Sequence, residues 1–156
     1  MIVRMAEAAD VPDILRLIRA LAEYEREPDA VEATEAMLAE RLFAPVPAVW
    51  AFVAELDGRV VGIAVWFLNF STWTGRHGVY LEDLFVETEA RGRGIARALF
   101  RALAREAVRR GCARLDWQVL DWNEDAKAAY RALGARHQAG WEPWRIDGDA
   151  LAALAE

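Results

Sequence analysis

Two neighbouring stretches of this sequence hold residues that could do chemistry. The first is a pair of adjacent carboxylates, Glu82 and Asp83, within the aromatic and branched residues 80–86, which predict a β-strand. The second is the loop 91–96, Arg-Gly-Arg-Gly-Ile-Ala, which opens a predicted helix. Glycines before a helix expose backbone N–H groups, and the helix dipole adds positive potential there. With its two arginines, this loop suits an anion such as a pyrophosphate.

Two common glycine motifs do not match this loop. A P-loop requires Gly-Lys-Ser or Gly-Lys-Thr, which the chain lacks. A dinucleotide fingerprint requires Gly or Ala three places after the second glycine, and position 97 is arginine. The remaining pattern, R-G-x-G-x-A after a strand that carries acids, resembles the acyl-CoA loop of the GNAT superfamily of N-acetyltransferases. The resemblance implies that acetyl-CoA is bound by Arg91, Gly92, Arg93, Gly94, Ile95, Ala96 and Arg97.

The elements around these stretches alternate between strands and helices, which predicts an α/β fold. Asp57-Gly58 predicts a tight hairpin between two strands. Asp10, Thr34 and Asn123 are predicted helix N-caps. The expected strands are 2–5, 49–56, 59–69, 80–86, 113–119 and one or two within 135–146; the expected helices are 10–24, 34–43, 95–109 and 123–133, with a last helical turn at 149–154.

These elements form one domain, 1–156, with a mixed, mostly antiparallel central sheet flanked by about four helices. The order matches the GNAT fold, which implies that the strand holding Glu82 is splayed to admit the acyl-CoA. In a regular strand Asp83 would face away from Glu82, and a β-bulge would change that. The arginines at 97, 101, 105 and 109 recur every four residues and are expected to form a solvated stripe.

Further motifs resemble one branch of this superfamily, the spermidine/spermine (diamine) N-acetyltransferases. They are Ala-Glu-Tyr-Glu at 22–25, Tyr-Leu-Glu-Asp at 80–83, Asp-Trp-Asn-Glu at 121–124 and the run 129–135, so the resemblance covers nearly the whole chain. It implies a homodimer with the amine groove at the subunit interface. It also implies contacts to the acyl-CoA from the backbone of Leu84, Phe85 and Val86 and from Asn123, Ala126 and Tyr130.

Amine acetylation requires a base, because only the neutral form of an amine with a pKa near 10 attacks a thioester. The expected catalytic residues are Glu82, acting as the base through water, and Tyr130, protonating the CoA thiolate. Carboxylates beside aromatic rings suit a cationic substrate. The expected substrate-binding residues are Tyr24, Glu25, Glu82, Asp83, Asp116, Trp117, Gln118 and Glu142.

Three functions agree with these residues. The main hypothesis is acetylation of a diamine or polyamine such as spermidine or spermine. The first alternative is acetylation of a lysine-like amino acid such as thialysine, and the second is a non-catalytic sensor that binds acyl-CoA. The presence of both Glu82 and Tyr130 counts against the sensor, which has no need of an acid–base pair.

Composition narrows the possible partners. The net charge of −6 and the pI of about 5.1 argue against nucleic acid. A single cysteine, Cys112, excludes an internal disulfide and a cysteine-based zinc site, and we expect no metal. No run of apolar residues resembles a signal peptide or a membrane span, so we expect a cytoplasmic protein that acts on a small-molecule amine.

Overall fold

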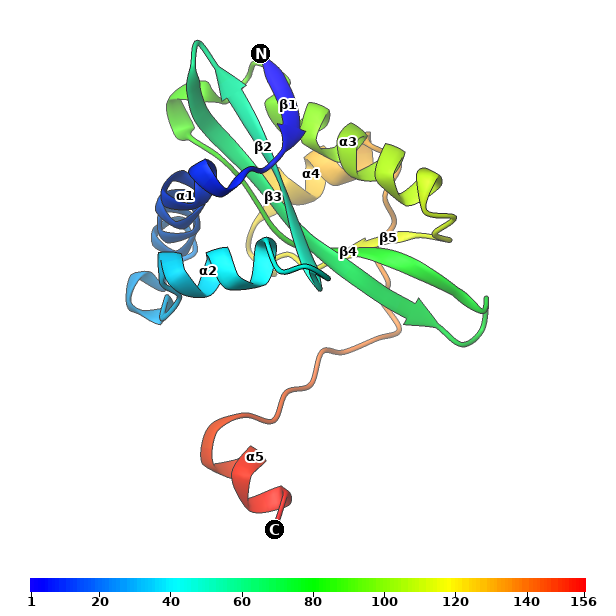
Figure 1. The fold of residues 1–156 in the computed structure, drawn as a ribbon. Helices are drawn as coiled ribbons and strands as arrows, with labels where there is room; N and C mark the ends of the chain where they lie inside the picture. The colour runs from blue at the N-terminus through cyan, green and yellow to red at the C-terminus, as the bar shows by residue number, and fades with distance from the viewer. The chain divides into compact units, whose positions relative to one another are not determined.

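A computed structural model describes residues 1–156 and divides them into two compact units, 1–120 and 121–156 (Figure 1). None of the helices is long and apolar enough to cross a membrane.

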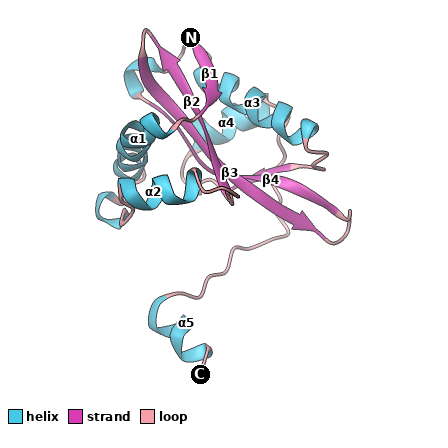
Figure 2. Cartoon of the chain, in the orientation of Figure 1, coloured by secondary structure: helices cyan, strands magenta, loops and turns pink.

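The first unit is built on one five-stranded sheet whose strands lie side by side in chain order (Figure 2). All neighbours pair antiparallel except the last two, which are parallel. The mixed, mostly antiparallel sheet that the sequence predicts is thereby confirmed. The strands are β1 (Ile2–Met5), β2 (Val49–Leu56), β3 (Arg59–Ser71), β4 (Arg76–Val86) and β5 (Leu115–Trp117).

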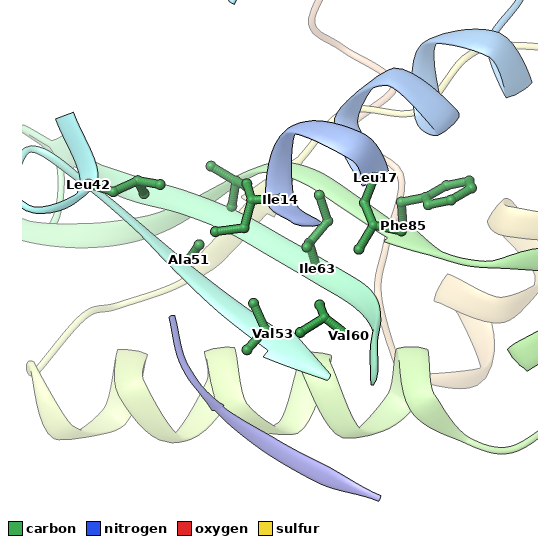
Figure 3. Close-up of a cluster of buried hydrophobic side chains, with 9 residues drawn as sticks. Ile14, Leu17, Leu42, Ala51, Val53, Val60, Ile63 and Phe85 are labelled. Carbon is green, nitrogen blue, oxygen red and sulfur yellow. The ribbon is translucent and has the colours of Figure 1, made fainter. Parts of the chain in front are cut away.

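Helices cover both faces of this sheet. On one face α1 (Val11–Tyr24) and α2 (Glu35–Leu42) enclose a core of hydrophobic side chains (Figure 3). On the other face lies α3 (Ile95–Arg109), where Ile95 packs close to Gly62 and the Arg110 guanidinium lies 5.1 Å from the Trp66 ring centre. The short 3₁₀ turns are η1 (Ala8–Asp10), η2 (Pro28–Ala30) and η3 (Thr88–Ala90).

The start of α1 differs from the expectation in one detail. Asp10 directly precedes the helix as predicted, but its side chain makes no cap bond to α1. Its carboxylate instead accepts from the Glu7 N–H at 2.7 Å and pairs with Arg4 at 2.6 Å. Asp10 therefore ties η1 to β1, because the arginine and the preceding turn offer stronger partners. Thr34 does cap α2, by accepting from the Met37 N–H.

The second unit contains α4 (Glu124–Ala132) and α5 (Gly148–Leu154). Asn123 caps α4 as predicted, with its Oδ1 accepting from the Ala126 N–H at 3.2 Å. The strand expected within 135–146 is wrong, since no strand forms there. A strand needs a neighbour for its backbone groups, this unit supplies none, and Pro143 has no N–H to donate.

Candidate active site

A β-bulge at Glu82 shapes the strand that carries both expected acids. Along the β3–β4 ladder Leu81 pairs with Trp66 and Asp83 pairs with Val65, so Glu82 has no opposite residue. Residues directly opposite in a ladder share a face of the sheet. Asp83 therefore lies on the face of Val65, under α1, whereas Leu81 lies on the opposite face with Trp66. The sequence allowed either a regular strand or a bulge here, and the structure has the bulge.

The two parallel strands separate just before this bulge. Their pairing covers three residue pairs and ends at Leu81 opposite Trp117. Beyond this point β4 continues to Val86 with only β3 as a neighbour. The strand edge over 84–86 thus has no partner strand, which matches the splay expected at Leu84, Phe85 and Val86.

The glycine loop follows directly and leads into α3. Gly92 and Gly94 have φ angles of +75° and +77°, which other residues rarely adopt. Gly94 has no side chain to cap the helix, and the first turn of α3 contains no acid. The N–H groups of this turn therefore remain available to a bound anion.

A small pocket of about 120 Å³ coincides with this loop. Six of its seven lining residues were predicted from the loop motif, and Val86 was predicted from the strand. Arg93 does not line it and is exposed. The lining residues are Val86, Arg91, Gly92, Gly94, Ile95, Ala96 and Arg97.

A larger pocket of about 360 Å³ is lined by residues of α1 and by Glu35 of α2. It contains none of the residues expected in the site. One of its arginines, Arg16, is already paired with Asp13 and Glu87. We choose the smaller pocket as the candidate site, because its backbone N–H groups and arginines suit an anion such as a pyrophosphate. The size of the larger pocket does not indicate any particular ligand.

Arg91 connects the loop with the substrate side of the site. Its Nε donates to the Val86 carbonyl at 3.1 Å. Its guanidinium lies over the rings of Tyr24, at 5.0 Å, and Phe85, at 5.5 Å. The end of α1, the end of β4 and the glycine loop therefore meet at one side chain, with the Tyr24 ring beside it.

Three carboxylates gather beside this junction. Asp83 is half-buried, and burial together with the charges of Glu82 and Glu25 raises the pKa of Asp83 to about 6. Burial also raises the pKa of Glu25, the residue that follows α1. Glu82 is exposed. The structure thus brings Glu25, Glu82 and Asp83 together, as expected for a site that attracts a cation.

Asp116 has partners that the sequence did not predict. Its Oδ2 lies 2.7 Å from Arg114 Nε and 3.1 Å from Asn69 Nδ2. The neighbouring Trp117 packs its ring 5.1 Å from that of Phe100, and Gln118 follows β5 in an exposed position. The alternation of Arg114 and Asp116 along one strand face could have indicated their pairing, whereas nothing local indicates Asn69.

The remaining expected residues belong to the second unit. Asn123 uses its side chain to cap α4, where Ala126 and Tyr130 lie. Glu142 is exposed in an irregular segment. The roles of these four residues stay predictions. On α3 the expected solvated arginines are exposed, and Arg109 pairs with Glu106 at 2.6 Å.

Comparison with known proteins agrees with this arrangement. Residues 13–135 match the model of the acetyltransferase (GNAT) family. A thialysine N-epsilon-acetyltransferase of Bos taurus is 39% identical over 164 residues, which cover 98% of this chain and 96% of that protein. The human spermidine/spermine N(1)-acetyltransferase-like protein 1 is 32% identical, over 98% of this chain but 23% of its own length.

The fold recurs among solved structures. An integron cassette protein from the mobile metagenome of V. cholerae superposes with a TM-score of 0.83 at 28% identity, covering 99% of this chain and 97% of that one. The glycine loop, the splayed strand and these similarities agree along nearly the full length of the chain. The chain therefore belongs to the acetyltransferase (GNAT) family and is an N-acetyltransferase, in a family that takes its acetyl group from acetyl-CoA.

Proposed function

We propose that this enzyme acetylates the side-chain amine of a lysine-like amino acid such as thialysine. The observation that carries the proposal is the 39% identity to the bovine thialysine N-epsilon-acetyltransferase, which extends over nearly the full length of both chains. The site agrees with a cationic acceptor, because Glu25, Glu82 and Asp83 surround the bulge of β4. A lysine-like amino acid therefore replaces the diamine or polyamine as the main hypothesis for the substrate.

In this proposal the first unit binds the acyl donor. The N–H groups at the start of α3 and the side chains of Arg91 and Arg97 hold the pyrophosphate. The unpaired edge of β4 over 84–86 holds the pantetheine by backbone hydrogen bonds. Asn123 and Ala126 provide further contacts to the same arm.

The chain's acid–base groups then carry the proton transfers. A carboxylate of the Glu82–Asp83 pair accepts the proton of the ammonium, so that the neutral amine can attack the thioester carbonyl. A backbone N–H near Leu84 polarises that carbonyl. Tyr130 protonates the departing thiolate. Tyr24 and Glu25 position the acceptor, together with Trp117, Gln118 and Glu142.

A diamine or polyamine remains the second candidate. The observation in its favour is the group of acids without a basic partner around Asp83, which suits a polycation. Asp116, however, is already neutralised by Arg114 and offers little attraction to a second ammonium. The acids available to a polycation are therefore fewer than the sequence indicates.

The test is CoA release by the purified protein, with acetyl-CoA and a panel of acceptors. The panel contains thialysine, lysine, ornithine, putrescine, spermidine and spermine. We expect the highest kcat/KM with a lysine-like amino acid. A clear preference for spermidine or spermine would return the polyamine to first place, and silence with every amine would contradict the enzymatic proposal. We also propose that the enzyme is a homodimer. Analytical ultracentrifugation of the same sample tests this oligomeric state.

A further inference from the structure

Asp83 occupies an unusual position for a carboxylate. The bulge at Glu82 turns it toward the sheet face that α1 covers, where Val65 and Phe85 belong to the hydrophobic core. Asp83 is half-buried there and has no hydrogen bond or ion pair. A half-buried carboxylate without a partner destabilises a fold, because the charge has lost part of its water.

The charges around Asp83 increase this cost. Glu82 is next to it on β4, and Glu25 approaches from the end of α1. Tyr24 lies on the same side, and Arg91 reaches this region from the glycine loop. The Arg91 guanidinium lies over the Tyr24 and Phe85 rings, however, and forms no ion pair with Asp83.

Asp10 shows how the same chain treats a buried carboxylate with a structural role. Asp10 is buried on β1's side of α1, and both of its oxygens are bonded, to Arg4 and to the Glu7 N–H. Those bonds lower the pKa of Asp10, whereas the pKa of Asp83 is raised. Asp83 has burial without compensation, which is the arrangement that tunes a carboxylate toward proton transfer near neutral pH.

We propose that Asp83, and not Glu82, is the group that takes the proton from the acceptor ammonium. This role rests on the proposed acetylation of an amine. An N–H bond of the ammonium breaks and an O–H bond forms on Asp83, directly or through one water. The neutral amine then attacks the thioester carbonyl and the C–N bond forms. As the C–S bond breaks and CoA leaves, the nitrogen gives up its second proton, which replaces the one that Tyr130 donates to the CoA sulfur. Asp83 afterwards releases its proton to solvent.

Glu82 and Glu25 act on this step through their charge. Both disfavour the ionised form of Asp83 and both attract the cationic acceptor. Glu82 is exposed to solvent, whereas Asp83 is half-buried. We assign Glu82 and Glu25 as positioning residues.

The experiment compares pH profiles of kcat/KM for the wild type, Asp83→Asn, Glu82→Gln and Glu25→Gln, with the best acceptor from the panel. Glu40→Gln, an exposed position on α2, is the matched control. The wild type and the control should gain activity through pH 6 and then reach a plateau. Asp83→Asn should lose the rise at pH 6 and about 10²–10⁴-fold in kcat/KM. Acetyl-CoA affinity, measured by calorimetry, should stay within about twofold of the wild type.

Glu82→Gln and Glu25→Gln should retain the rise and move it to lower pH, because each removes a negative charge near Asp83. Loss of the rise in Glu82→Gln with its retention in Asp83→Asn would overturn the proposal and make Glu82 the base. Retention of the rise in both Asp83→Asn and Glu82→Gln would overturn the proposal as well. A wild type that prefers a polyamine contradicts only the proposed substrate, since the comparison of the variants is unchanged.

Discussion

The guanidinium of Arg114, the residue before β5, lies 2.7 Å from the carboxylate of Asp116 on β5, the short strand that pairs parallel to β4. The pair reduces the charge that Asp116 presents to the cationic substrate proposed above. Arg114→Ala should therefore free this charge and raise kcat/KM for spermidine relative to thialysine by about 2–5-fold, the range of a partly exposed ion pair. The ratio of the two kcat/KM values measures the effect.

Arg105→Ala, an exposed position on α3, serves as the control for loss of an arginine charge. An Arg114→Ala enzyme with the wild-type substrate ratio would show that Asp116 lies outside the acceptor's reach.

We expect a substitution in the glycine loop to lower the affinity for the acyl donor. Gly94→Ala places a side chain at a φ of +77°, which costs about 1–2 kcal/mol and distorts the start of α3. We expect CoA affinity, measured by calorimetry, to fall about tenfold. Gly58→Ala is the matched control, because Gly58 has a φ of +80° in the β2–β3 turn, away from the pocket. Equal CoA affinity in both variants would contradict the assignment of the loop.

We expect Asp83 to lower the stability of the folded protein while serving the reaction. Its pKa is raised from 3.8 to about 6 in the folded state, so the folded protein binds this proton more tightly than the unfolded chain does. Folding is then penalised above about pH 6, and the penalty disappears as the pH falls below 4. Asp83→Asn should stabilise the protein by about 1–3 kcal/mol at pH 7.5, a Tm increase of about 3–8 °C.

Thermal melts of Asp83→Asn and the wild type at pH 7.5 and pH 4 test this directly. The gain should be present at the higher pH and nearly absent at the lower one. A variant that is less stable at pH 7.5 would mean that Asp83 has a structural partner.

The strand pattern and the loops could be predicted from the sequence. Asp57-Gly58 placed the β2–β3 hairpin, and the bounds 49–56 match β2. The glycine loop predicted most of the residues that line the pocket, because its signal is local: these residues are close together in the chain and precede a helix. The two strongest local signals, a turn and a helix start, therefore predicted the hairpin and the lining of the pocket.

Other features depend on partners that are far apart in the chain. Asn69 and Asp116 are separated by 47 positions, and no local pattern connects them. The segment 135–146 reads as a strand by composition but has no neighbouring strand to pair with. The bulge at Glu82 could only be named as an option, since the register of a ladder depends on both strands.

We expect substitution of Tyr130 to lower kcat without changing the affinity for acetyl-CoA. Tyr130→Phe removes only the phenolic hydroxyl, so acetyl-CoA affinity should remain at the wild-type value. If Tyr130 protonates the thiolate, kcat should fall about 10²–10⁴-fold. Stopped-time assays of CoA release, beside calorimetry of acetyl-CoA binding, measure the two quantities. Unchanged kcat would remove Tyr130 from the mechanism.

The most direct test of the proposed function is the identity of the product. Mass spectrometry with fragmentation of thialysine incubated with the enzyme and acetyl-CoA locates the added acetyl group. The proposal predicts one acetyl group, on the side-chain nitrogen, formed faster than any acetylated polyamine under equal conditions. Acetylated spermidine beside unmodified thialysine would contradict it.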